Sequence, residues 1–216
     1  MNLLIMGPAG SGKGTVSSGI VENFKLTHIS TGDMFREAIA NETPVGVEAK
    51  QYIDQGKLVP DEVTNRLVEE RLNQEQFEHG YLLDGFPRNL AQAEALEQIT
   101  DKDHLKIDLV LHLDVAEEEL IRRITGRRLC KDCGAIYHID HHPSEKEGVC
   151  DVCGGELYQR SDDTEEKFKV RHKAYLEQTQ PVIDFYREKG LVKDIDGGRK
   201  PEEVMNDVLE TLGALK

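Results

Sequence analysis

A glycine-rich segment near the start of the chain has the composition and spacing of a phosphate-binding loop. It runs from Gly7 to Thr15 and reads Gly-Pro-Ala-Gly-Ser-Gly-Lys-Gly-Thr, directly after an apolar run. Phosphate oxygens need convergent backbone N–H groups, which glycine permits because it has no side chain and adopts positive φ. Lys13 adds a point charge, and the helix expected to begin there adds its N-terminal dipole. Although Gly14 stands where a hydroxyl residue is usual, the pattern predicts nucleoside triphosphate binding.

The four cysteines form a second cluster of candidate functional residues. They make two Cys-x2-Cys pairs separated by sixteen residues, Cys130/Cys133 and Cys150/Cys153. This spacing is typical of a four-thiolate zinc site. Two disulfides are disfavoured in a cytoplasmic chain, and inert core thiols are disfavoured by the polar neighbouring residues. Nearby histidines are rival ligands, but four thiolates already complete a tetrahedron; these histidines are His138, His141 and His142.

Apolar runs that alternate with helical patterns must position these residues. Strands are expected at 2–6, 27–30, 81–84, 109–113 and 191–195. Helices are expected up to about residue 24 and at 33–40, 45–55, 61–74, 91–99, 116–124, 164–188 and 201–212. The alternation predicts an α/β fold with a doubly wound, five-stranded parallel sheet. With the glycine-rich loop after its first strand, we expect the P-loop NTPase fold. Ligands of such sheets bind beyond the carboxyl ends of the strands, where Gly7, Asp84 and Asp114 fall.

Two stretches interrupt the alternation. Residues 30–59 form a helical excursion, and residues 126–163 hold the cysteines and show no helical period. The second stretch is too short to build an apolar core, so a bound metal would hold it together. We therefore expect two inserted mobile subdomains on a core made of 1–29, 60–125 and 164–216.

The charge balance limits the partners. The formal net charge is −14, from 27 basic and 41 acidic residues, so a nucleic acid would be repelled. No apolar stretch reaches the roughly 18–20 residues of a membrane span or resembles a signal peptide. We expect a cytoplasmic protein with no membrane partner and no cleaved leader. Because the chain is acidic, phosphate binding requires locally clustered cations, and arginines outside acidic runs are the candidates.

Four further motifs make the chain resemble a known family. One reads Thr31-Gly32-Asp33-Met34-Phe35-Arg36, and another reads Asp84-Gly85-Phe86-Pro87-Arg88 with Gln92 one helical turn beyond. Gly126-Arg127-Arg128 precedes the cysteines, and Gln159-Arg160-Ser161-Asp162-Asp163 follows them. Together with the phosphate loop, and over essentially all 216 residues, the chain resembles the adenylate kinase family, in its bacterial long form with a zinc-bearing lid.

The resemblance implies transfer of the γ-phosphoryl group of Mg-ATP to AMP, ATP + AMP = 2 ADP. Such in-line transfer depends on positioning and on charge stabilisation, for which guanidinium groups are well suited. The implied catalytic residues are Lys13, Asp84, Arg88, Arg123, Arg127, Arg160 and Arg171. The implied cofactors are a structural Zn²⁺ in the lid and Mg²⁺ with ATP. The implied partners are ATP, AMP and ADP, bound by a monomer under closed lids.

The resemblance also divides the binding residues between the two nucleotides. The ATP site would comprise Gly10, Ser11, Gly12, Lys13, Gly14, Thr15, Arg127, Ile136, Tyr137 and Arg199. The AMP site would comprise Thr31, Arg36, Lys57, Leu58, Val59, Gly85, Phe86, Pro87, Arg88, Gln92, Arg160 and Arg171. Asp84 would order Mg²⁺ and its waters, while Asp33 would either assist it or cap the following helix.

Several alternatives remain open at this stage. Tyr137 could pack on the zinc knuckle instead of covering adenine, and Gln92 could be an exposed helix residue. Thr31 and Gln92 favour AMP over GMP, UMP or CMP only through the resemblance. A nucleotide-switched binding module, whose zinc knuckle grips nucleic acid or protein, is a further possibility. The acidic balance and the lack of a basic-aromatic patch near the cysteines argue against that module.

Overall fold

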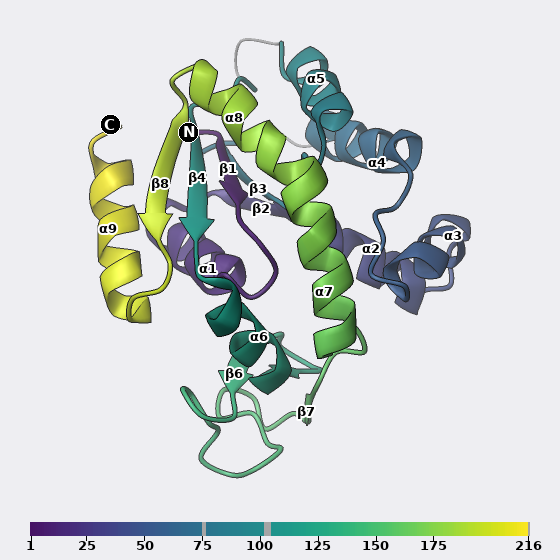
Figure 1. Cartoon of the computed structure of the whole chain (residues 1–216), viewed down its shortest axis with the longest axis vertical. Helices are drawn as coiled ribbons and strands as arrows, with labels where there is room; N and C mark the ends of the chain where they lie inside the picture. Colours follow the sequence, from purple (N-terminus) through teal and green to yellow (C-terminus); the bar gives the residue numbers. More distant parts are fainter. Residues whose placement is uncertain (75–76, 102–104, 216) are drawn as a thin grey trace.

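The computed structural model describes residues 1–74, 77–101 and 105–215, and its centre is a parallel β-sheet (Figure 1). The strands are β1 (Leu3–Met6), β2 (Thr27–Ser30), β3 (Tyr81–Asp84), β4 (Leu109–Asp114) and β8 (Val192–Asp196). Their order is β2-β3-β1-β4-β8, and every neighbouring pair is parallel. The predicted five-stranded α/β fold is confirmed. The predicted core range also includes 75–76, 102–104 and 216, which lie outside the described residues.

Helices connect these strands, as the alternating pattern predicts. They are α1 (Lys13–Phe24), α2 (Thr31–Ala40), α3 (Pro44–Ile53), α4 (Asp61–Gln74), α5 (Leu90–Ile99), α6 (Glu117–Gly126), α7 (Glu165–Ala174), α8 (Gln180–Glu188) and α9 (Pro201–Gly213). The single helix predicted at 164–188 is wrong in one respect, because a π-helical turn, η1 (Tyr175–Thr179), separates α7 from α8. A wider turn of this kind leaves the apolar spacing nearly helical, so the pattern does not reveal it.

Side chains of the strands alternate between two apolar layers. Leu4 and Met6 pack on one face of the sheet in a cluster that includes residues of α8. Leu3 and Ile5 pack on the other face, against residues of α1 and α9. Figure 1 shows α8 in front of the sheet and α1 behind it. Because both faces are covered, the central strands read as continuous apolar runs rather than as alternating ones.

The two interrupting stretches leave the sheet at different places. Residues 30–59 contain α2 and α3, while residues 126–163 contain a small antiparallel sheet. Its strands are β5 (Arg127–Cys130), β6 (Ile136–His138) and β7 (Leu157–Tyr158), in the order β6-β5-β7. The sequence did not predict these strands, because they are short and none of them is a continuous apolar run of four residues. Figure 1 places the small sheet at one end of the molecule, away from α3.

Side-chain caps set the starts of several helices. Ser30, Thr43, Asn89 and Thr164 each accept a hydrogen bond from a backbone N–H of the first turn that follows. Asp33 does not cap α2, because Ser30 accepts from the Asp33 N–H at 3.2 Å. None of the helices in the described ranges is long and apolar enough to span a membrane.

Candidate active site

The glycine-rich loop joins β1 to α1 and leaves the start of that helix uncapped. Gly10 and Gly12 have φ values of 86° and 94°, which side chains would disfavour. Gly12 is the N-cap of α1, and no side chain of the described residues caps it. The first amide groups of α1 are therefore available to an anion. Ser11 is buried, and its Oγ has no hydrogen-bond partner within the described ranges. These features fit a phosphate group.

The positively charged side chain of Lys13 lies near several arginines. Its Nζ donates to two carbonyl groups of the loop, at 2.7 and 2.8 Å. Burial lowers the pKa of Lys13 to about 8; Asp84 raises it, and the charges of Arg88 and Arg171 lower it further. A bound polyphosphate would raise the pKa of Lys13 again, because its negative charge favours the protonated amine. The lysine is thus suited to phosphate oxygens.

A cleft lies between α2, α3 and the end of β3. Ten of its lining residues were predicted for the AMP site: Thr31, Arg36, Lys57, Leu58, Val59, Gly85, Arg88, Gln92, Arg160 and Arg171. Six others were not predicted: Gly32, Phe35, Ile53, Gly56, Thr64 and Asp162. Phe35 and Ile53 lie in apolar helical patterns, which indicated only a packed face.

Two residues predicted for the AMP site lie elsewhere. Phe86 is 1% exposed and packs into the core cluster on the α8 face of the sheet, and Pro87 is buried. Neither lines the cleft in the part of the chain that the structure describes. The motif placed them with Gly85 and Arg88 by adjacency alone. A large apolar ring next to a buried strand packs into the core, since that removes its surface from water.

The base-reading pair predicted by the resemblance lies in this cleft. Thr31 Oγ1 donates to the carbonyl of Gly85 at 2.9 Å. Gln92 is buried: its Oε1 accepts from the backbone N–H of Arg88 at 2.8 Å, and its Nε2 donates to Asp61 at 2.7 Å. The alternative of an exposed helix residue is therefore wrong for Gln92.

Two aspartates organise three of the arginines. Arg127 donates twice to Asp163, at 2.8 and 2.5 Å, and Arg160 donates twice to Asp162, at 3.0 and 2.9 Å. Arg171 reaches the same Asp162 at 2.8 Å. Sequence reasoning gave these acids no role, although both follow Arg160 in one short motif. Paired guanidinium groups hold a defined geometry, so the cluster is organised by the protein itself.

The charge state of this cluster follows from its contacts. Burial would raise the pKa of Asp162, but Arg160 and Arg171 outweigh it and lower the value to about 2. Burial lowers the pKa of Arg171 to about 10, against the attraction of Asp162. At neutral pH the carboxylate is therefore ionised and the guanidinium is protonated. The cluster therefore contains ionised aspartates among a larger number of protonated arginines.

Arg36 and Arg123 also have carboxylate partners. Arg36 pairs with Asp33 one helical turn earlier; burial raises the pKa of Asp33, and this pairing lowers it overall. Arg123 Nε donates to Glu119 at 2.9 Å, and its NH1 donates to the carbonyl of Gly197 at 2.8 Å. A Cβ on Gly197 would lie 3.2 Å from the backbone oxygen of Ser11, so Arg123 reaches the border of the phosphate loop.

Asp84 ends β3 beside the phosphate loop. Its side chain is 15% exposed, and its oxygen lies 3.9 Å from His28 Nε2. Its charge raises the pKa of Lys13, which means that the two groups are close. A partly accessible carboxylate next to a triphosphate site suits Mg²⁺, which prefers oxygen ligands and keeps several waters.

The ATP-binding residues predicted outside the phosphate loop differ from one another in exposure and in contacts. Ile136 is 37% exposed, and its Cδ1 would be 3.1 Å from a Cβ on Gly14, so the small sheet touches the phosphate loop. Tyr137 is 4% exposed and packs in the cysteine cluster, which favours the packing alternative for its side chain. Arg199 pairs with Asp207 of α9.

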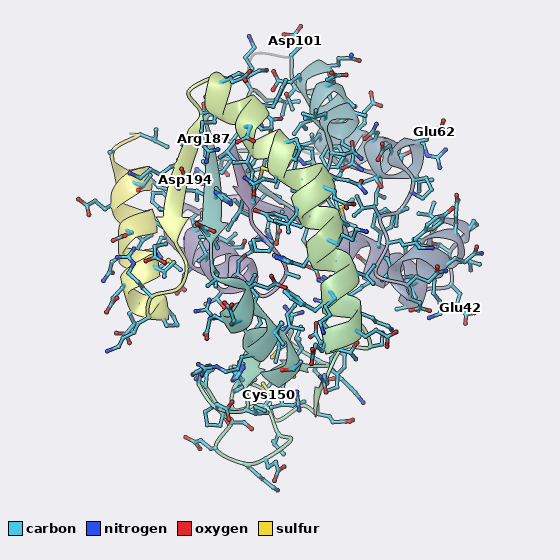
Figure 2. All side chains as sticks on the ribbon, in the orientation of Figure 1. Glu42, Glu62, Asp101, Cys150, Arg187 and Asp194 are labelled. Atoms are coloured by element: carbon cyan, nitrogen blue, oxygen red, sulfur yellow. The ribbon has the colours of Figure 1, made fainter. Side chains whose placement is uncertain are left out.

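The four cysteines form one compact cluster. Their Sγ atoms all lie within 4.8 Å of one another, with Cys130–Cys153 at 3.4 Å and Cys133–Cys150 at 3.5 Å. Disulfide sulfurs lie about 2.0 Å apart, whereas four thiolates around zinc lie about 3.8 Å apart. A hydrogen bond with Tyr137 lowers the pKa of Cys150 to about 6. Cys150 marks this site in Figure 2. The cluster fits one metal ion.

No histidine of the described residues joins this metal-binding group. His138 accepts from backbone N–H groups of its own loop, His141 contacts Arg122, and His142 stacks on Tyr137. The three side chains have roles of their own in the loop, in agreement with a four-thiolate set.

Comparison with known proteins identifies the family. The family model described as adenylate kinase matches residues 5–191. A protein named adenylate kinase from Geobacillus sp. (strain WCH70) is 52% identical over 216 residues, which is 100% of both chains. Proteins of the same name from Bacillus subtilis (strain 168) and Carboxydothermus hydrogenoformans are 51% and 52% identical, and the matches cover at least 98% of every chain. With this full-length similarity, and with the phosphate loop, the arginine-lined cleft and the cysteine cluster in one molecule, the chain belongs to the adenylate kinase family.

Proposed function

We propose that the reaction of this adenylate kinase, ATP + AMP = 2 ADP, takes place in the cleft between α2, α3 and the phosphate loop. The carrying observation is that four guanidinium groups, those of Arg36, Arg88, Arg160 and Arg171, line one cleft. The charges of Arg88 and Arg171 also act on Lys13 of the loop, so donor and acceptor sites adjoin. A phosphoryl group that passes between two nucleotides needs this concentration of positive charge.

The acceptor nucleotide occupies the cleft. Arg36 and Arg88 bind the AMP phosphate, and the base lies between Thr31 and Gln92. The lining supports this assignment, because it includes residues 57–59 and Gly85, which the resemblance assigns to the AMP site. Apolar contact with the base comes from Val59 and neighbouring side chains of α2 and α3.

The donor nucleotide occupies the glycine-rich loop. Backbone N–H groups of Gly10 to Thr15 surround the phosphates, and Lys13 contacts their terminal oxygens. Arg127 and Ile136 approach from the small sheet, while Arg199 and the backbone of Tyr137 lie towards adenine. An oxygen of the AMP phosphate attacks the γ-phosphorus in line as the bond to the β-phosphate oxygen breaks.

The arginine–aspartate cluster prepares the site for the transfer. Arg123, Arg160 and Arg171 surround the migrating phosphoryl group and stabilise the charge on its oxygens. Asp162 keeps two of them in place through contacts of 2.8–3.0 Å. Preorganised donors lose little free energy on reordering during the reaction, which is why they stabilise a transition state strongly.

Two metal ions complete the proposal. Asp84 would hold Mg²⁺ through water, and the ion when bound neutralises charge on the transferring phosphates. The four cysteines would hold a structural Zn²⁺, since four thiolates leave no open position for water or substrate.

We also propose that the chain acts as a monomer in the cytoplasm, with a core of 1–29, 60–125 and 164–216. Residues 30–59 form an AMP-binding subdomain, and residues 126–163 form a lid. Closure of both excludes water, which would otherwise accept the phosphoryl group. The contact of Ile136 with the phosphate loop supports such a closure.

Hydrogen exchange provides a test of this motion. We expect an inhibitor with two adenosines joined by five phosphates to protect 30–59 and 126–163 more than α9, because only a closed form contacts it from both sides. Mass spectrometry of peptides with and without the inhibitor measures the difference. Protection confined to the phosphate loop would contradict the two-lid proposal and leave ATP binding intact.

An acceptor assay tests the function itself. With Mg-ATP as donor, we expect AMP to give by far the highest kcat/KM among AMP, GMP, CMP and UMP. A coupled assay for ADP measures all four under the same conditions. A higher kcat/KM for another monophosphate would mean that this nucleotide, and not AMP, is the acceptor. If no phosphoryl group is transferred to any of the four, the result would favour the nucleotide-switched binding module.

A further inference from the structure

The carboxylate of Asp61 lies at one end of the Gln92 side-chain amide. Gln92 Nε2 donates to Asp61 Oδ1 at 2.7 Å, and Gln92 Oε1 accepts from the backbone N–H of Arg88 at 2.8 Å. An ionised carboxylate only accepts hydrogen bonds, whereas a backbone N–H only donates them. The two neighbours therefore agree on one orientation of the amide, with its NH2 group towards Asp61. Because Gln92 is 1% exposed, water competes little for these contacts.

Asn89 connects the same groups a second time. Its Nδ2 donates to Asp61 Oδ1 at 2.9 Å, and its Oδ1 accepts from the backbone N–H of Gln92 at 2.8 Å. One carboxylate oxygen at the start of α4 thus accepts from two side chains at the start of α5. Asp61, Asn89 and Gln92 form a connected network whose members hold one another in place.

The orientation of this amide decides which purine it can pair with. Each of its two polar atoms keeps one unused position, a lone pair on Oε1 and a hydrogen on Nε2. On its Watson–Crick edge adenine presents an amino donor beside a ring-nitrogen acceptor, and guanine presents a carbonyl acceptor beside a ring N–H donor. An amide that turns over can serve either base. An amide held in one orientation opposes guanine with donor facing donor and acceptor facing acceptor.

We propose that Asp61 is a positioning residue that gives the acceptor site its preference for adenine over guanine. It fixes the Gln92 amide in the orientation that adenine requires. The inference rests on the proposed function, in which Gln92 faces the acceptor base in the cleft that it lines. The backbone donor of Arg88 favours the same orientation, but substitution of its side chain leaves that donor in place. Asp61 is the contact that mutation can remove.

The test is the acceptor selectivity of Asp61→Ala. With saturating Mg-ATP, kcat and KM are measured for AMP and for GMP. We expect the ratio of kcat/KM for AMP over GMP to fall about tenfold or more, the discrimination typical of one bidentate base contact. The loss should lie mainly in a higher KM for AMP, with kcat at saturating AMP changed by no more than about twofold, since Asp61 does not touch the phosphates.

Glu62→Ala is the matched control. Glu62 belongs to the same first turn of α4, carries the same charge and is exposed, and Figure 2 shows it at the outer edge of the molecule. We expect its selectivity to equal that of the unmodified chain. If Asp61→Ala lowers kcat/KM for both acceptors by the same factor, or changes the ratio no more than Glu62→Ala does, Asp61 only supports the helix and the proposal is overturned.

Gln92→Leu separates this inference from the proposed function. A ratio that is unchanged in Gln92→Leu would remove Gln92 from base recognition and overturn both. A ratio that collapses in Gln92→Leu but persists in Asp61→Ala would overturn the role of Asp61 alone. If Asp61 acts through Gln92, adding Asp61→Ala to Gln92→Leu lowers the ratio no further.

Discussion

Replacing Arg88 with alanine is expected to lower kcat about a thousandfold, the loss typical of a charged donor removed from a transition state. The guanidinium lines the cleft, and its Nε donates to the carbonyl of Gly85 at 2.7 Å, which directs the group. Burial lowers the pKa of Arg88, against the attraction of Asp84, so the charge stands in a weakly solvated place where electrostatic interactions are strong. Steady-state kinetics with AMP as the varied substrate measures the effect, and KM for AMP should rise as well.

The fold should survive this substitution. The backbone contacts of Arg88 with Gln92 and Thr179 do not involve its side chain and remain possible in alanine. Arg88→Lys should recover little activity, because an ammonium group lacks the planar pair of donors. Arg66→Ala, on the exposed side of α4, is the control for loss of an arginine and should leave kcat unchanged. A near-normal kcat in Arg88→Ala would exclude Arg88 from the proposed site.

Cys130→Ser is expected to abolish tight metal binding and to lower the melting temperature by about 5–10 °C, or roughly 2–3 kcal/mol at 2–4 °C per kcal/mol. Cys130 is buried, and its sulfur lies 3.4 Å from that of Cys153. The surrounding apolar cluster is small, with Tyr137 and Leu157 among its members, so metal–thiolate bonds must supply most of the local stability. Metal analysis of the purified chain and calorimetry measure both effects.

Nucleotide binding to the core should persist in this variant, since the phosphate loop and the five-stranded sheet lie outside residues 126–163. Val152→Ser is the matched control: Val152 sits in the same turn as Cys150 and Cys153 but is 75% exposed, so metal content should not change. A chelator should reproduce the lower melting temperature in the unmodified chain. Purified protein that contains disulfides and no metal would contradict the structural-metal proposal.

Much of the fold could be predicted because its signals are local. The strands at 27–30 and 81–84 and the helix at 61–74 lie where the sequence predicted them, although Ile29 is the single apolar residue of the first. A buried central strand such as β3 is a short continuous apolar run, which can be recognised without knowledge of its neighbours. The π-helical turn at Tyr175–Thr179 was not predicted, because it changes the helical period too little. The small antiparallel sheet was not predicted, because its short strands contain no continuous apolar run.

The candidate site also has parts that the sequence determines and parts that depend on the tertiary structure. The amino-acid sequence by itself determined the phosphate loop and the cysteine cluster, since a glycine-rich turn and two Cys-x2-Cys pairs carry their chemistry in adjacent residues. Only the tertiary structure decided that Tyr137 packs against Cys150, that Asp162 pairs with Arg160 and Arg171, and that Gln92 donates to Asp61. The last contact joins residues 31 positions apart on two helices. Such a hydrogen bond depends on how whole helices pack against the sheet, and no local spacing encodes that.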